Sequence, residues 1–356
     1  MSQEDFRSHL IRYGGDPYPH VVEKALGCYV WDETGSRVLD FTSGQMCATV
    51  GHNHPRIVEA IKKSCESALH LFSGMIPRSV VDLAAAMAKI LPKPLTKSLF
   101  LNTGSESNDA AIKMAKMYTG GFEVVGLGGS WHGVTGNAGA ASFASDRKAY
   151  GPGMPGGHVI PEPNAYRCPV QHCKNTCDHT CMKVGFNLYD MQSTGSRAAV
   201  IAEPIISAGG VIVPPPGYFE ALQAEAKKRN MLLIFDEAQT AFGRIGSWFA
   251  ATQLGVTPDI LTVSKTLGGG VPLAGVMTSE EIEQKVHERG FAFYTSHVSD
   301  PLPASVGLAV LETLVEERLL ERSVEMGEYL HKSLLELQSR HEEIGDVRGM
   351  GAMLAM

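Results

Sequence analysis

The sequence lacks the features that bind polyanions or membranes. Lysine and arginine number 31 against 38 aspartates and glutamates, which gives a formal net charge of -7, and the basic residues form no run. No apolar stretch approaches the roughly 20 residues of a membrane-spanning helix. The G-x-x-x-x-G-K-[ST] loop of nucleoside triphosphatases is absent as well. We therefore expect neither nucleic acid nor a membrane as a partner, and a protein that acts on small molecules.

Cysteine is scarce and its count is odd, with seven in 356 residues. Residues 1–7 are polar and partly acidic, unlike a secretion signal or a mitochondrial transit peptide. A hydrophobic content of 44% and a charged content of 19% are typical of a globular chain, and the length suffices for one large domain and a smaller one. These observations predict reduced thiols and a cytoplasmic enzyme.

Apolar runs alternate with helical patterns through the middle of the chain. This pattern predicts an α/β fold with a mostly parallel sheet that helices cover on both faces. In such sheets, functional groups gather beyond the carboxyl ends of the strands. The turn residues 34–36 lie between two short apolar segments and predict a hairpin near the N-terminus. The expected strands of the large sheet are residues 98–101, 123–127, 198–203, 231–236, 259–263 and 273–277.

Two of these strands end in residues that can do chemistry. Residues 259–263 lead into Lys265, and residues 231–235 lead into Asp236. A lysine at a buried strand end loses hydration, which favours its neutral, nucleophilic form. Each residue alone has a simpler explanation, because lysines after strands are usually solvated and acidic pairs often begin helices or bind metals. Together they predict a pyridoxal phosphate site, in which Lys265 forms the Schiff base and Asp236 holds the pyridinium N–H.

Two further segments could complete such a site. Residues 102–108 join a predicted strand to a predicted helix, and Thr103, Gly104 and Ser105 could wrap a phosphate at the positive end of that helix. Serine and threonine are also ordinary helix caps. Trp131 lies among glycines and could stack on a pyridine ring. A partly buried core tryptophan explains this residue about equally well.

Four blocks of sequence carry a family resemblance. The Asp-Glu-Ala-Gln block at 236–239 and the Ser-Lys-Thr-Leu block at 264–267 are specific for one class of enzyme. The Ser-Gly-Gln-Met block at 43–46 and the Thr-Ser-His-Val-Ser-Asp-Pro block at 295–301 indicate one branch of it. The chain resembles, over nearly its whole length, the class III aminotransferases, which are fold type I pyridoxal phosphate enzymes. Within them it is most similar to the 2,2-dialkylglycine decarboxylases.

The resemblance implies an architecture. Members of the family have a three-layer αβα large domain with a mostly parallel sheet, and a small α+β domain built from the two termini. By position, residues 1–42 would begin the small domain and residues 43–305 would form the large pyridoxal phosphate-binding domain. Residues 306–356 would form the linking helices and the start of an incomplete C-terminal small domain. We therefore expect the small domain to be truncated at Met356.

The resemblance also assigns residues to the cofactor. Lys265 would form the Schiff base, Asp236 would pair with the pyridinium, and Gln239 would hydrogen-bond the phenolate oxygen. Ser296 would reach the phosphate from a neighbouring subunit, because the relatives are dimers with sites at the interface. We therefore expect a homodimer or a dimer of dimers. The implied cofactor residues are Thr103, Gly104, Ser105, Trp131, Asp236, Gln239, Lys265 and Ser296.

Catalysis in this family would involve Lys265, Trp131 and Gln45. Whichever Cα bond lies perpendicular to the pyridinium plane breaks, because its electrons flow into the ring. Gln45 would contact the substrate carboxylate in that position, which favours loss of CO₂, and Lys265 would act as acid and base. We expect decarboxylation and transamination of 2,2-dialkylglycines such as 2-aminoisobutyrate, with a keto acid such as pyruvate as amino acceptor.

Two departures from the family pattern keep other functions open. Ala208 stands where the decarboxylase pattern has a second serine that helps to bind the substrate carboxylate, although Ser207 remains. An ω-aminotransferase or an amino-phosphate lyase, which act without decarboxylation, is the alternative. The substrate-carboxylate arginine of the relatives lies in a segment beyond Met356. A non-catalytic fragment that retains the fold is the second alternative.

Residues 166–181 have no counterpart in the family pattern. They contain Cys168, Cys173, Cys177 and Cys181 in C-x₄-C-x₃-C-x₃-C spacing, with two histidines between them. Four soft ligands within one loop could bind a structural zinc ion. The spacing differs from the usual C-x₂-C pairs, so that two disulfides or free thiols are the alternatives.

Overall fold

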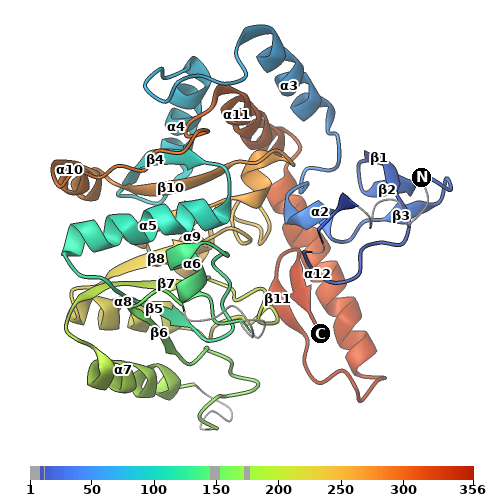
Figure 1. Ribbon diagram of the computed structural model, residues 1–356. Helices are drawn as coiled ribbons and strands as arrows, with labels where there is room; N and C mark the ends of the chain where they lie inside the picture. The colour runs from blue at the N-terminus through green and yellow to red at the C-terminus, as the bar shows by residue number, and fades with distance from the viewer. Residues whose placement is uncertain (1–8, 12, 145–152, 172–176) are drawn as a thin grey trace.

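The computed structural model describes residues 9–11, 13–144, 153–171 and 177–356. A seven-stranded sheet forms its centre, and helices pack on both faces of the sheet (Figure 1). The three-layer α/β architecture predicted from the sequence is confirmed. In the order in which they lie across the sheet, the strands are β4 (Leu95–Leu101), β10 (Ala274–Ser279), β9 (Ile260–Val263), β8 (Leu232–Asp236), β7 (Arg197–Ala202), β5 (Glu123–Leu127) and β6 (Gly157–Ile160).

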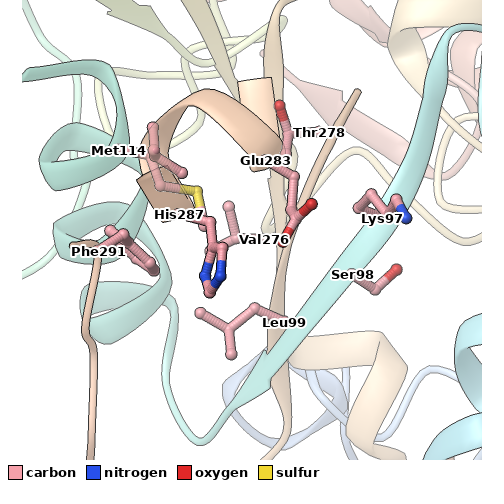
Figure 2. A pocket seen from close by; sticks show the side chains of 10 residues that line it. Lys97, Ser98, Leu99, Met114, Val276, Thr278, Glu283, His287 and Phe291 are labelled. Carbon is pink, nitrogen blue, oxygen red and sulfur yellow. The ribbon is translucent and has the colours of Figure 1, made fainter. Parts of the chain in front are cut away.

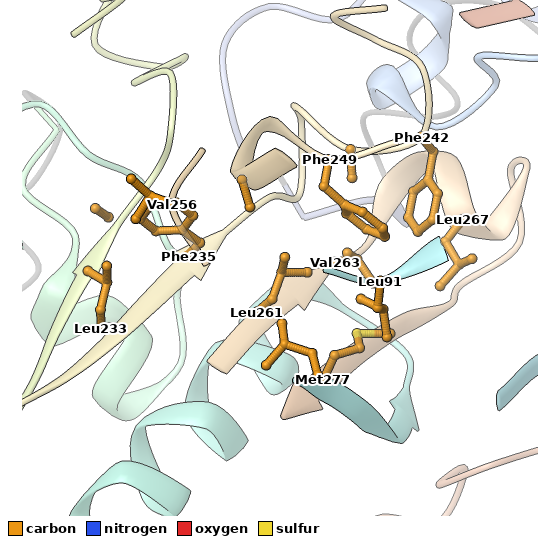
Figure 3. Close-up of a cluster of buried hydrophobic side chains, with 14 of the residues drawn as sticks. Leu91, Leu233, Phe235, Phe242, Phe249, Val256, Leu261, Val263, Leu267 and Met277 are labelled. Atoms are coloured by element: carbon orange, nitrogen blue, oxygen red, sulfur yellow. The ribbon is translucent and has the colours of Figure 1, made fainter. Parts of the chain in front are cut away.

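The central strands are apolar throughout because both faces of the sheet are buried. On β8, Leu233 and Phe235 belong to one buried cluster, whereas Leu232 and Ile234 belong to another. Successive side chains of a strand point to opposite faces, which explains this division. Figure 3 shows part of the first cluster, including Leu233 and Phe235. The first cluster includes residues of α3 (Pro55–Ser67), α4 (Arg78–Ile90), α7 (Thr180–Gln192), α8 (Tyr218–Lys228) and α11 (Pro301–Glu316), and the second includes residues of α5 (Gly104–Thr119) and α10 (Glu280–Glu288).

One strand runs against the others. Strands β5 to β9 pair in parallel, whereas β10 pairs antiparallel with both β9 and β4. Residues 264–273 connect β9 to β10 through only a short 3₁₀ helix, η2 (Lys265–Gly268). A crossover to a parallel strand needs about a dozen residues or more, usually with a helix. The predicted mostly parallel sheet is confirmed, with the strand expected at 273–277 reversed in direction.

The N-terminal strands form a separate antiparallel sheet that lies apart from the large one (Figure 1). Tyr29 pairs with Leu39 and Trp31 pairs with Arg37, which confirms the hairpin predicted around residues 34–36. No helix in the part of the chain that the structure describes is long and apolar enough to cross a membrane. The domain boundaries stay a prediction. The remaining elements are β1 (Val22–Leu26), β2 (Tyr29–Asp32), β3 (Arg37–Leu39), α2 (Ser43–Met46), α6 (Gly136–Ala141), α9 (Ala250–Leu254), α12 (Leu319–Gln338), β11 (Arg348–Met350) and β12 (Met353–Ala355).

Candidate active site

A cavity of about 430 Å³ opens near the carboxyl ends of the central strands. Trp131 follows β5, Asp236 ends β8 and Lys265 follows β9, and all three line the cavity. Ligand pockets of open α/β sheets lie in this position. The volume falls within the range of about 300–1,000 Å³ that small-molecule sites occupy. The residues predicted from the sequence that line the cavity are Gln45, Thr103, Gly104, Ser105, Trp131, Asp236 and Lys265.

Two predicted site residues are not among those that line the cavity. Gln239 is half-buried in the segment after β8. Ser296 is exposed in the segment that precedes α11. Their roles therefore stay predictions.

Lys265 has an unusual backbone conformation. Its φ is 46°, in the left-handed region that residues with a side chain adopt rarely. Strain of this kind costs about 1–3 kcal/mol and persists where the surrounding structure enforces it, commonly at functional sites. The next residue is held in place, because the Thr266 hydroxyl oxygen lies 2.8 Å from that of Thr49. The strained turn thus fixes the point at which the lysine amine enters the cavity.

A buried hydrogen-bond network fixes Asp236. Its Oδ2 accepts a hydrogen bond from Asn108 Nδ2 at 2.8 Å and lies 2.9 Å from His132 Nδ1, while its Oδ1 accepts the N–H of Ala238 at 3.1 Å. Asn108 is itself oriented, because its Oδ1 accepts the Thr262 hydroxyl at 2.7 Å and its Nδ2 also donates to the His132 carbonyl. The carboxylate therefore meets the cavity in one orientation, and Oδ1 keeps a lone pair for a further donor.

The N-terminal turn of α5 lies at the cavity and is suited to bind an anion. Thr103 caps the helix, because its hydroxyl accepts the Glu106 N–H at 3.2 Å and the Glu106 side chain accepts the Thr103 N–H at 3.2 Å. A Cβ on Gly104 would lie 2.9 Å from Ser264 Oγ, so that only glycine leaves this approach open. Ser105 Oγ accepts two backbone N–H groups of the facing loop, at 2.9 and 3.0 Å. The helix N-terminus and its N–H groups favour a bound phosphate or carboxylate.

Gln45 lines the cavity from the short helix α2. Asp40 organises this segment, since its carboxylate accepts the N–H groups of Thr42 and Gly44, both at 2.8 Å, and lies 2.7 Å from His52 Nε2. Burial raises the pKa of Asp40, but these hydrogen bonds outweigh that effect and hold the pKa well below its usual range. Asp40 was not found by the sequence analysis, because its partners become visible only once the turn is formed.

The sequence analysis also missed a cation behind the cavity. Arg244 donates from Nη2 to Thr49 Oγ1 at 3.1 Å, and burial lowers the pKa of its guanidinium. Burial raises the pKa of the Cys47 thiol, which lines the cavity, while the charges of Lys265 and Arg244 lower it. Two basic side chains therefore lie on this side of the cavity, which favours an anionic ligand. No motif in the sequence marked Arg244.

The loop that carries Ala208 lies outside the residues that line the cavity. Ala208 is exposed, and neither it nor Ser207 is among the residues that line the cavity. Ser207 Oγ is buried and has no hydrogen-bond partner among the described residues. The role of Ser207 therefore stays a prediction.

The cysteines of the predicted zinc loop lie apart from the cavity lining. Cys173 falls outside the described residues, and Cys181 is buried in α7, where burial and the charges of Cys177 and Cys168 raise the pKa of its thiol to about 11. Among the described residues, the sulfur atoms of Cys168, Cys177 and Cys181 do not all lie within 4.8 Å of one another.

One compact group of metal-ligating side chains is found within the described ranges. It consists of His70, His297 and Asp300, whose ligand atoms all lie within 4.8 Å of one another. The buried Asp300 carboxylate lies 2.7 Å from His70 Nδ1 and 2.6 Å from His297 Nδ1. These hydrogen bonds explain the cluster as a contact between two segments of the chain.

A second, smaller cavity of about 200 Å³ is lined by residues of β4, β10 and α10 (Figure 2). Leu99, Met114, Val276 and Phe291 give it largely apolar walls, with His287 beside them. No residue that the sequence analysis assigned to a site lines it. The predicted site residues that line either cavity therefore line the one of about 430 Å³ and not this one.

Comparison with known proteins gives a consistent result. The sequence model of the aminotransferase class-III family matches residues 11–356. The chain is 49% identical over 345 residues to an uncharacterized aminotransferase of Schizosaccharomyces pombe, an alignment that covers 97% of the chain and 77% of that protein. An (S)-enantioselective omega-transaminase from Thermomicrobium roseum is similar in structure, with a TM-score of 0.90, 32% identity and coverage of 99% of this chain and 82% of that one. So is taurine:2-oxoglutarate aminotransferase from Bifidobacterium kashiwanohense, solved with PLP and glutamate, with a TM-score of 0.91, 29% identity and the same coverage.

Proposed function

The chain belongs to the class III aminotransferase family, and we propose that it catalyses the decarboxylation and transamination of 2,2-dialkylglycines with a small keto acid as amino acceptor. Pyridoxal phosphate is the cofactor of this family. When bound, it supplies an electron sink that takes up the electron pair of the bond broken at the substrate Cα. The remaining tasks, which are binding, orientation and proton movement, fall to side chains of the protein.

The cavity fits this cofactor. Asp236 Oδ1 keeps a lone pair for a pyridinium N–H, the first turn of α5 offers backbone N–H groups to a phosphate, and Lys265 brings a primary amine. Trp131 brings an aromatic face to the same space. The residues proposed to hold the cofactor are Lys265, Asp236, Gln239, Thr103, Gly104, Ser105 and Trp131, with Ser296 from a second subunit.

The shared position of Gln45 and Lys265 carries the proposal of decarboxylation. Both side chains line one cavity, so that an amide and an amine meet the same bound substrate. Gln45 Nε2 donates a hydrogen bond to the substrate carboxylate and holds it in the orientation that leads to loss of CO₂. Lys265 Nζ delivers a proton to the substrate carbon and removes one from the second substrate.

Incubation of the holoprotein with 2-aminoisobutyrate and pyruvate tests this proposal. We expect acetone, CO₂ and alanine in equal amounts. Gln45→Ala should lose most of the CO₂ release and retain amino transfer from an ordinary amine donor. Wild-type protein that transfers amino groups but forms no CO₂ or acetone from 2-aminoisobutyrate would rule out the decarboxylase.

The exposed Ala208 favours a second candidate, ω-amino transfer without decarboxylation. The expected serine hydroxyl is missing there, and Ser207 Oγ is buried, so that this loop provides no hydroxyl to a substrate α-carboxylate. The two structural neighbours carry the names of an omega-transaminase and a taurine aminotransferase. Alanine formed from pyruvate and a primary amine without an α-carboxylate, with no CO₂, would support this candidate.

An exposed apolar face supports the proposal of a homodimer. Phe72 and Tyr294 are 72% and 82% exposed, on two segments that meet where the rings of His70 and His297 lie 4.9 Å apart. Apolar surface of this kind marks association sites. Ser296 lies on the same segment, from which it would reach the cofactor of a second copy. A monomer by light scattering at micromolar concentration would contradict the proposal.

We keep the structural zinc ion at Cys168, Cys173, Cys177 and Cys181 as a separate proposal. The four cysteines within one short stretch of sequence are its support. Metal analysis of the purified protein tests it. Less than stoichiometric zinc after purification without chelator would rule it out.

A further inference from the structure

Glu203 follows β7 and is almost fully buried, with 5% of its surface exposed. Its Oε1 accepts the backbone N–H of Trp131 at 2.8 Å, and its Oε2 accepts the backbone N–H of Ser207 at 3.1 Å. One carboxyl group therefore joins the loop after β5 to the loop after β7. The two connections use the two separate oxygen atoms of the carboxyl group.

The two loops touch through glycines rather than side chains. A Cβ on Gly209 would lie 2.8 Å from the carbonyl oxygen of Gly129, and Gly129 has a φ of 73°. A larger residue at either position would separate the loops or strain the backbone. Main chain therefore lies against main chain here, and the hydrogen bonds of Glu203 fix one loop relative to the other.

The anchored loop also carries groups of the candidate active site. Trp131 lines the cavity, and the next residue, His132, lies against Asp236. The N–H of His132 is held separately, by Ser142 Oγ at 2.8 Å. Glu203 and Ser142 thus hold two successive N–H groups, and the indole ring leaves the chain between those two fixed points.

The charge state of Glu203 responds to the same surroundings. Burial raises the pKa of Glu203, the charge of His132 lowers it and the charge of Asp236 raises it, and together these effects bring it to about 7. An ionised carboxylate accepts N–H hydrogen bonds more strongly than the neutral acid does. The hold on Trp131 should therefore strengthen as the pH rises through about 7.

We infer that Glu203 is a positioning residue of this active site. Its two hydrogen bonds set the main chain at Trp131, and thereby the place at which the indole ring meets a bound ligand. Glu203 does not touch the ligand itself. The inference rests on the proposed function in one respect, since the ligand that Trp131 meets is there proposed to be pyridoxal phosphate.

Glu237 provides a matched control. It is fully buried, and its carboxylate accepts the N–H groups of Ala250 and Ala251 at 2.7 and 2.8 Å and the hydroxyl of Thr240 at 2.8 Å. Burial raises the pKa of Glu237 to about 7 as well. None of its partners lines the cavity. A loss caused merely by removal of a buried charge would therefore affect Glu203→Gln and Glu237→Gln alike.

The fluorescence of Trp131, measured with and without cofactor, tests this inference. The chain has three tryptophans, so that Trp31→Phe and Trp248→Phe leave Trp131 as the sole emitter. In this background, Glu203→Ala should raise acrylamide quenching of Trp131 and shift its emission, whereas Glu237→Gln should leave both unchanged. Glu203→Gln keeps the shape of the side chain and one acceptor atom, so that it should retain part of the wild-type signal. If Glu203→Ala does not fold, Glu203→Gln is the variant to be measured in its place.

Cofactor binding gives the second readout. We expect the dissociation constant of pyridoxal phosphate to rise about tenfold in Glu203→Ala, the effect of losing one charged hydrogen bond, with a weaker visible circular dichroism signal per bound cofactor. Equal changes in the Glu203 and Glu237 variants, or none in either, would overturn the inference. Wild-type protein that binds no cofactor, together with altered Trp131 quenching in Glu203→Ala, would refute the proposed function and leave the positioning role intact.

Discussion

His132 Nδ1 lies 2.9 Å from Asp236 Oδ2, and both side chains are buried. An imidazole N–H directed at a carboxylate keeps that carboxylate in one orientation. Asn108 gives the same oxygen a second donor at 2.8 Å. Two donors thus bind one oxygen of Asp236, and the other oxygen can accept a hydrogen bond from a ligand in the cavity.

We predict that Asp236→Asn weakens cofactor binding and activity by about 100-fold, because it replaces an anion that faces a cationic ring with a neutral amide of the same shape. Equilibrium titration with pyridoxal phosphate measures this. Asp259→Asn is the control, since Asp259 accepts the Leu233 N–H at 2.7 Å from the opposite end of β8 and does not line the cavity. Equal losses in the two variants would show that Asp236 has no special role.

Asn108→Ala should destabilise the fold by about 2–4 kcal/mol, because it leaves the Thr262 hydroxyl and the His132 carbonyl buried without their partner. Urea unfolding measures the change in the free energy of unfolding. Ser98→Ala removes a buried hydroxyl that has no partner among the described residues, and should cost little. A loss below about 1 kcal/mol in Asn108→Ala would show that water replaces the network.

The stability conferred by Glu237 should fall as the pH rises. Burial raises its pKa in the folded protein to about 7, above the ordinary value of 4.5, so that the folded state binds more protons than the unfolded state between these values. Its contribution is therefore greatest below pH 4.5 and is lost as the pH passes through 7. Relative to the wild type, Glu237→Gln should gain up to about 3 kcal/mol of stability between pH 4.5 and 7. Urea unfolding at a series of pH values measures this.

For Glu123 we expect the opposite dependence of stability on pH, so that Glu123 serves as the comparison for Glu237. Burial by itself raises the pKa of Glu123, but hydrogen bonds from Ser193 and Thr194 outweigh burial and lower the pKa to about 2. The stability that Glu123 confers is present above pH 4.5 and is lost as the pH falls towards 2. Parallel pH profiles for Glu123→Gln and Glu237→Gln would contradict the account of both residues.

Gly104→Ala should weaken cofactor binding by about tenfold, because the added Cβ would lie 2.9 Å from Ser264 Oγ at the phosphate end of the cavity. Removing that hydroxyl in the double variant with Ser264→Ala should restore part of the affinity. A double variant as weak as Gly104→Ala would show that the contact with Ser264 is not the cause.

The sequence predicted the residues that lie at strand ends. Lys265 and Asp236 follow apolar runs, and the rule that parallel strands end at one edge of a sheet brings them together. It did not predict the reversed direction of β10. That direction depends on how residues 264–273 fold into η2, and an apolar run carries no sign of its direction.

The supporting network could not be predicted. Asn108 meets Asp236 across 128 positions, Glu203 meets Trp131 across 72, and Thr262 meets Asn108 across 154. Side chains so far apart show no periodicity or spacing in the sequence, because tertiary packing alone brings them into contact.

Lys265 is the centre of this account, and reductive trapping tests it most directly. The purified protein is incubated with pyridoxal phosphate, reduced with borohydride, digested and analysed by mass spectrometry. We predict that the cofactor is found attached to Lys265 and that Lys265→Ala abolishes the attachment. Attachment to another lysine, or none, would contradict the account and would support a non-catalytic protein with the family fold.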